Sequence, residues 1–229
     1  MPEESSKKDL ILQSMSEKSS TKQNVYHTTL EVFHELKSIL QEIENEYNQV
    51  LQGADSRVLF SYKDNGIFEA ELKFSGDILI FQMHSNVFEF NREHNIWKLS
   101  YVKDNYLNSF VGIINVYNFL SDSFKYKRYE DLGYLVGRVF INRDRHYFVE
   151  GKKQLSFLYN DFGKSIITRE ALKEIVETTI SYALDFDLLV PPYEHVKLTS
   201  VGQVAQKRQF SKQVTGKRLG FQFNTDDID

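Results

Sequence analysis

A chain of 229 residues that is 41% hydrophobic is long enough to bury a substantial core. It contains no cysteine, which excludes disulfides, thiol nucleophiles, iron–sulfur clusters and zinc–thiolate sites. The net charge of −4 is small but unevenly distributed, since residues 124–153 hold eight basic and four acidic side chains. With no apolar run long enough for a signal sequence or a membrane-spanning helix, the sequence predicts a cytoplasmic protein that does not enter a membrane.

The first 51 residues divide into two segments. Residues 1–23 are rich in Ser, Lys and Glu, and this composition predicts a disordered tail. A helix is predicted from Val25 to Leu51, because apolar residues recur there at spacings of three and four, namely Phe33, Leu36, Leu40, Ile43, Tyr47 and Val50. We expect this stripe to pack on the protein's own sheet. A homodimer through the N-terminal helix is the alternative.

A series of antiparallel strands is predicted after this helix. Asn65-Gly66 predicts a two-residue type I′ turn that pairs Asp64 with Ile67. The core face of this hairpin should hold Leu59, Phe68, Ala70, Leu72 and Phe74. Further strands are expected near residues 78–84, 87–91 and 96–102. Residues 109–120 fit a long strand, although periodicity alone leaves a helix open.

A second hairpin, residues 135–142 and 146–151, is predicted around Arg143-Asp144, which pairs Gly137 with Glu150. Thr168 should cap a helix whose apolar stripe is Leu172, Ile175, Val176, Thr179, Ala183 and Leu184. The predicted fold class is therefore α+β, with a long N-terminal helix, a central antiparallel meander of about seven or eight strands in a strongly curved sheet or half-barrel, and a C-terminal helix packed on it. Residues 24–196 would form this single domain, followed by a basic segment at 197–229 that has an acidic end and could add an edge strand.

One strand carries a pattern used by metal-dependent nucleases. Glu150-Gly151-Lys152 fits E-x-K, and Asp131 is the carboxylate that could share a Mg²⁺ ion with Glu150. The chain has three matches to [D/E]-x-K, against about 2.7 expected by chance, and the predicted residue opposite Glu150 is a glycine rather than an acid. A nuclease is therefore an alternative rather than the main hypothesis.

The other candidate catalytic and ligand-binding motifs each lack a residue or a spacing that the site would need. The six histidines lack the i, i+4 spacing of a helical metal site, and we expect no bound metal. The Gly-Lys-Ser at 163–165 lacks the preceding glycine of a phosphate-binding loop, because Leu158 stands there. We therefore expect no cofactor and favour a non-catalytic protein.

Basic and aromatic residues alternate in "FKYKRY" at 124–129, a combination that binds single-stranded nucleic acid. The structural alternative is that these aromatics point into the core while the cations protect a sheet edge. The candidate binding residues are the cations of this region and of the C-terminal segment: Lys125, Lys127, Arg128, Arg138, Arg143, Arg145, Lys152, Lys153, Lys207, Arg208, Lys217 and Arg218.

The main hypothesis is a non-catalytic binding or adaptor domain. Its partner would be another protein or an anionic surface such as a nucleic acid or an acidic protein face. The alternatives are the Mg²⁺-dependent nuclease and a small-ligand pocket formed by the curved, aromatic-rich sheet.

Overall fold

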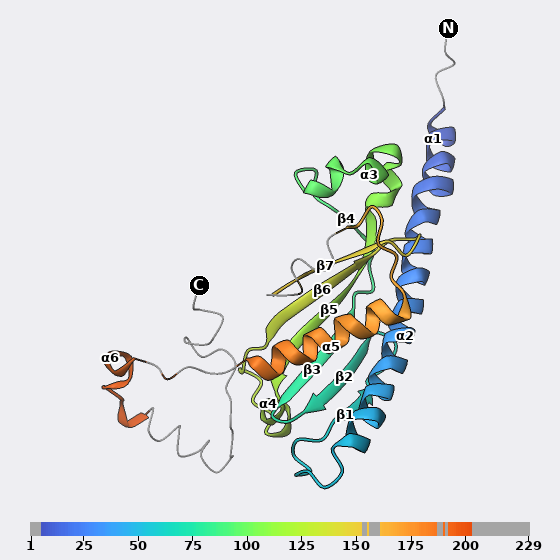
Figure 1. Cartoon of the computed structure of the whole chain (residues 1–229). Helices are drawn as coiled ribbons and strands as arrows, with labels where there is room; N and C mark the ends of the chain where they lie inside the picture. Colours follow the sequence, from blue (N-terminus) through green and yellow to red (C-terminus); the bar gives the residue numbers. More distant parts are fainter. Residues whose placement is uncertain (1–5, 153–154, 156–160, 187–189, 191, 203–229) are drawn as a thin grey trace.

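The computed structural model describes residues 6–152, 155, 161–186, 190 and 192–202. Figure 1 shows a long helix along one side of a twisted sheet, with a second helix crossing the sheet. The helices are α1 Lys7–Ser14, η1 Met15–Ser19 (a π-helical turn), α2 Ser20–Val50, η2 Asn95–Lys98, α3 Ser100–Asp104, η3 Tyr106–Ser109, α4 Ser121–Lys125, α5 Arg169–Asp185 and α6 Tyr193–Val196. The strands are β1 Ser61–Asp64, β2 Glu69–Phe74, β3 Asp77–Met83, β4 Phe88–Glu89, β5 Phe110–Leu120, β6 Tyr134–Ile141 and β7 Tyr147–Gly151.

Within the described residues, seven strands form one open antiparallel sheet in the order β1-β2-β3-β5-β6-β7, and the short β4 pairs with the start of β5. Neighbouring strands of the main path are paired antiparallel throughout. Both long helices contribute to the same buried cluster as the inner faces of these strands. This arrangement confirms the predicted α+β class, the long N-terminal helix and the C-terminal helix on the sheet.

Helix α2 packs on the sheet through the predicted apolar stripe. Phe33, Leu36, Leu40 and Ile43 are buried, whereas Val50, at the end of the stripe, is 85% exposed. Because most of the stripe is covered by the chain's own sheet, it is not free to form a coiled coil. The helix approaches β5 closely at Gly112, where a Cβ atom would collide with the side chain of Thr29.

Helix α5 begins at the predicted cap, since the Thr168 hydroxyl accepts a hydrogen bond from the Ala171 N–H at 3.2 Å. Its stripe is buried as expected except for Leu184, which is 47% exposed. Arg169 and Lys173 of α5 form ion pairs with Glu42 and Glu46 of α2. Polar contacts on the surface thus accompany the apolar contacts that hold the two helices on one face of the sheet.

The N-terminal region differs from the expected tail. Residues 7–23 are helical and continue into α2, so that one helical rod extends to Val50. Its first turn has a capping box, in which Ser6 and Asp9 each bind the other's backbone N–H group. Composition alone does not predict the helix at residues 7–23. It takes no account of the capping box, or of α2, from which the helix can extend without a new nucleus.

Both predicted hairpin registers are wrong. Asp64 pairs with Ala70 rather than Ile67, because only Gly66 of the expected type I′ turn has positive φ and the loop is longer. In the second hairpin Arg145 has positive φ, which gives a longer turn than Arg143-Asp144. The register moves by one, so Glu150 faces Arg138 and Gly137 faces Gly151.

The strand predicted at residues 96–102 is also wrong, since this segment forms the 3-10 helix η2 and the start of α3. Residues 109–120, for which a helix was left open, form β5 almost in full. An edge strand within 197–229 falls largely outside the described residues, and residues 197–202 contain no strand.

Candidate binding pocket

The face of the sheet opposite α2 and α5 carries a second, aromatic cluster. Phe140 of β6 and Phe148 of β7 stack with ring centroids 4.6 Å apart, and Phe162 meets Phe148 edge-on at 5.6 Å. The segment from Phe90 to Val102 covers this cluster, with Ile96 and Val102 buried in it. Offset and edge-to-face ring pairs add about 0.5–1.5 kcal/mol each beyond area burial. The cluster therefore fixes the covering segment on this end of the sheet.

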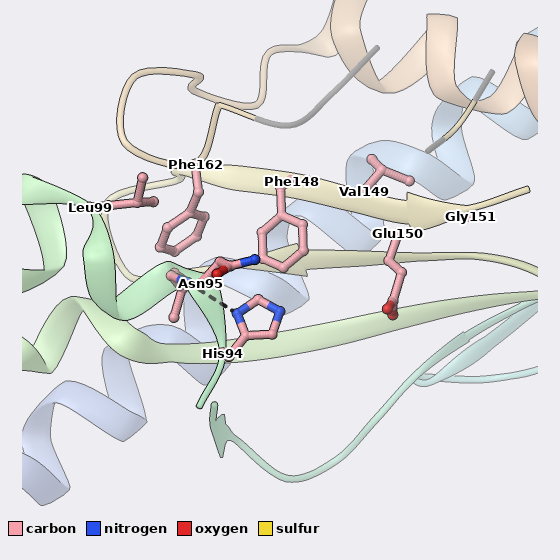
Figure 2. A pocket seen from close by; sticks show the side chains of 9 residues that line it. His94, Asn95, Leu99, Phe148, Val149, Glu150, Gly151 and Phe162 are labelled. Atoms are coloured by element: carbon pink, nitrogen blue, oxygen red, sulfur yellow. Dashed lines mark hydrogen bonds between the residues drawn. The ribbon is translucent and has the colours of Figure 1, made fainter. Parts of the chain in front are cut away.

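At the rim of this cluster is a pocket with a volume of about 490 Å³. Figure 2 shows its apolar wall, formed by Leu99, Phe148 and Phe162, with the polar side chains of His94, Asn95 and Glu150 around it. Ligand pockets in proteins are usually about 300–1,000 Å³, mostly apolar, with a few converging polar groups. This pocket has both properties.

His94 is held in place at the pocket by its backbone and by a neighbouring ring. Its imidazole stacks on Phe90 with centroids 4.6 Å apart, and its Nδ1 accepts a hydrogen bond from the Ile96 N–H at 3.3 Å. In a neutral imidazole one ring nitrogen accepts and the other donates, so this bond leaves Nε2 as the donor. The side chain is exposed, which leaves Nε2–H available to a ligand.

Glu150 is the charged residue of the pocket, and it is paired. Arg138, opposite it on β6, donates from Nε to the Glu150 carboxylate at 2.8 Å, and the two side chains are 39% and 56% exposed. The guanidinium of Arg138 also lies 5.3 Å from the centroid of the Phe140 ring. Two further hollows, of about 270 and 210 Å³, are lined in part by the same Arg138–Glu150 pair. Three adjacent depressions therefore follow β6 and β7 on the outer face.

The structure gives the proposed nuclease residues other partners. Asp131 accepts hydrogen bonds from Arg128 Nε at 2.7 Å and from the Ser123 hydroxyl at 2.6 Å. Glu150 binds Arg138, and Lys152 is exposed. Within the described ranges, no group of three His, Asp or Glu residues is placed to hold a metal ion.

Most of the arginines predicted to bind an anion are engaged within the molecule. Arg128 is buried beside Asp131, and Arg145 forms a bidentate ion pair with Glu35 at 2.9–3.0 Å. Arg143 donates to Thr21 and Asn108, and its Nε lies 3.5 Å from Asp144. These carboxylates offset much of the positive charge that the sequence shows. Lys125, Lys127 and Lys152 are exposed, while Lys153, Lys207, Arg208, Lys217 and Arg218 lie outside the described residues.

Among the residues that line the pocket, the sequence draws attention only to those on the strand that contains Glu150. The strand that contains Glu150 draws attention by its charges, yet it also brings the apolar Phe148 to the pocket wall. Leu99 escapes sequence reasoning because a strand is expected at 96–102, and no local pattern brings His94 or Phe162 to β7. The spacing of three between Ile96, Leu99 and Val102 was the available signal, since it matches a 3-10 turn better than a strand.

Comparison of the chain with protein-family models, with curated proteins and with solved structures finds no significant match. In the part of the chain that the structure describes, no helix combines the length and the apolar character needed to cross a bilayer.

Proposed function

We propose that the protein is a non-catalytic protein-binding domain that recognises an extended partner segment along β6 and β7. A large apolar or aromatic side chain of the partner would enter the pocket between Leu99, Phe148 and Phe162. The observation that carries this proposal is the apolar pocket with His94 and Glu150 at its rim. The cytoplasmic location predicted from the cysteine-free sequence belongs to the same proposal.

The shape of the outer face favours a peptide segment over a compact small ligand. The three hollows adjoin one another at Glu150, and together they cover a strip rather than a single cavity. Successive side chains of an extended chain point to alternate sides, so every second one could occupy a hollow. The His94 Nε2–H and the Glu150 carboxylate could then bond the partner's backbone.

The pocket is also placed on a rigid support. Phe148 lies on a strand and is only 9% exposed, and stacking on Phe140 fixes its ring. Rigid, pre-formed aromatic surfaces lose little conformational entropy when they bind, which favours affinity. This property suits a recognition site.

The first experiment titrates N-acetyl-tryptophanamide into the ¹⁵N-labelled full-length chain and follows amide chemical shifts. We expect the largest shifts at residues 94–99 and 148–151. In a second step, random twelve-residue peptides displayed on phage are selected on the same protein. We expect the enriched peptides to share an aromatic or large apolar residue.

A matched pair of variants distinguishes the pocket from the general surface. Leu99→Trp should fill the pocket and weaken selected peptides at least tenfold, or about 1.4 kcal/mol. Tyr106→Trp changes a side chain on η3 that is 46% exposed and does not line the pocket, so binding should stay unchanged. Equal affinity of the Leu99→Trp variant and the wild type, or shifts centred away from both segments, would overturn the proposal.

A further inference from the structure

The first turns of the N-terminal helix extend beyond the body of the protein (Figure 1). Helix α1 has no buried residue. Its apolar side chains are more than half exposed: Leu10 54%, Ile11 60%, Leu12 53% and, at the start of η1, Met15 60%. One face of the helix holds Lys8, Ile11, Leu12 and Met15. Ile11 and Leu12 follow Lys8 by three and four residues, and Met15 follows them by four and three. We refer to residues 7–15 as the arm.

The arm receives little stabilisation from packing. Most helical stability in proteins comes from burial of an apolar face, and an isolated helix shorter than about 12–15 residues is marginal in water. Here an apolar face with a lysine beside it stays in solvent in the single chain. Such a face gains free energy when a complementary surface covers it.

A complementary surface lies near the other end of the same rod. A groove of about 680 Å³ opens between the end of α2, the second half of α5, the segment that precedes β1 and the end of β2. Phe60 and Phe74 stack along it at 5.1 Å, and Tyr47 meets Phe60 edge-on at 5.2 Å. Its lining is mainly apolar: Tyr47, Val50, Leu51, Val58, Phe60, Phe74, Ser75, Glu177, Ile180, Ser181 and Leu184.

The groove is open to solvent and its charge is opposite to that of the arm. Val50 is 85% exposed and Leu184 47%, as noted above, and Val58 is 38% exposed. Glu177 is the one charged residue among these lining side chains, and it accepts a hydrogen bond from the Tyr47 hydroxyl at 2.8 Å. The arm carries Lys7 and Lys8 against Asp9, which leaves it one net positive charge. A basic apolar helix therefore matches an apolar groove with an acidic residue.

The arm cannot reach the groove of its own chain. Met15 and Val50 are joined by one continuous helical rod. At 1.5 Å per residue the distance between them along the axis is about 50 Å. An arm that fills the groove must therefore come from another molecule.

We propose that the groove between α2 and α5 binds the arm of a second copy of this chain. Because each copy has an arm at one end of the rod and a groove at the other, two antiparallel copies can fill both grooves at once. This contact differs from a dimer through the Phe33–Ile43 stripe, which is buried on the sheet. No residue of the arm or of the groove lines the His94 pocket, so this proposal does not depend on the proposed peptide binding.

The absence of cysteine makes a crosslinking test direct. One preparation carries Leu12→Cys and another carries Val50→Cys, and the two are mixed under mild oxidation. We expect a disulfide-linked pair that contains one chain of each kind, formed faster than either like pair. Leu132→Cys, at an exposed residue that belongs to neither surface, replaces Val50→Cys in the control and should give little crosslink.

Sedimentation and light scattering test the same contact without a crosslink. The wild type should associate as its concentration rises to about 100 µM, at which a Kd of about 10 µM gives mostly bound chains. Val50→Lys and, separately, Ile11→Ser should each weaken association at least tenfold, whereas Leu132→Lys should not. Val50→Lys should still fold, because the side chain is exposed and a cation is favourable at a helix C-terminus.

Two results would overturn the inference. One is a wild-type chain that stays monomeric throughout this range. The other is a failure of either variant test: association that both variants retain shows this, and so does a Leu12–Val50 crosslink no faster than the Leu12–Leu132 control. Loss of peptide binding with unchanged association would bear only on the proposed function.

Discussion

The two faces of the sheet are covered in different ways. The inner face is covered by α2 and α5, whose apolar stripes join the strands in one large cluster. The outer face carries a small cluster of its own at one end, covered by the short turns η2 and α3, and at the other end Phe119 of β5 meets Phe124 of α4. The long helices leave a continuous core, while the short turns leave a pocket at their rim. The comparison shows that the better-packed face stabilises the fold and the less complete one provides a candidate site.

The largest expected effect is on the inner face. Phe81→Ala removes a side chain that is 0% exposed and should lower the free energy of unfolding by about 4 kcal/mol. That is much of the stability of an ordinary domain, about 5–15 kcal/mol. Urea denaturation followed by circular dichroism measures this loss, with Phe88→Ala as control because Phe88 is 36% exposed. A loss below about 1.5 kcal/mol would contradict a continuous inner core.

The outer cluster should respond to a similar truncation less strongly and more locally. Phe162→Ala should cost about 3 kcal/mol, the low end for such a change, because a small cluster at a rim can collapse around the gap. Hydrogen exchange should accelerate mainly in residues 95–104. Equal acceleration in β3 and β5 would show that the two faces unfold as one unit.

A polar contact at the edge of the inner layer gives a smaller effect with a pH dependence. Lys37 donates to Asp64 at 2.6 Å and to the Gly66 carbonyl, and the hydrogen bond from Lys37 is the main cause that lowers the pKa of Asp64. Lys37→Met keeps the aliphatic stem and should cost about 1–2 kcal/mol at pH 7.

The sign of the pH effect follows from the lowered pKa. The Lys37–Asp64 contact contributes to the free energy of unfolding above the pKa of an unfolded Asp, about 3.9. This contribution is lost as the pH falls through the lower pKa that Asp64 has in the folded protein. The stability difference between wild type and Lys37→Met should therefore shrink below pH 4 in urea titrations. When Asp64→Asn is already present, the effect of Lys37→Met on the free energy of unfolding should not change below pH 4, because residue 64 no longer titrates. A difference that stays constant from pH 7 to acid would rule out the linkage.

The smallest expected effect is at the ion pair on the outer face. Glu150→Gln should change the free energy of unfolding by less than about 0.5 kcal/mol, because both partners are largely exposed. Glu35→Gln breaks the more buried bidentate pair with Arg145 and should cost about 1 kcal/mol or more. Thermal denaturation measures both losses of stability. A larger loss for Glu150→Gln than for Glu35→Gln would show that burial of the ion pair does not determine its contribution.

The sequence predicts the inner layer well because its signals are local and periodic. The stripes of α2 and α5 and the Thr168 cap each depend on spacings within one element. The hairpin registers fail because turn geometry depends on single residues, such as the positive φ at Arg145. The pocket could be predicted only in part, since η2 and Phe162 reach β7 through contacts between distant segments.

The close approach of Thr29 to Gly112 has a consequence for how substitutions would be tolerated. A methyl group at residue 112 would occupy the space of the Thr29 side chain, so it would force α2 away from β5 along their contact. In a saturation-mutagenesis experiment scored by folding, we expect position 112 to accept glycine alone. A residue with no side chain and no role in either proposed site would then appear among the least replaceable in the protein.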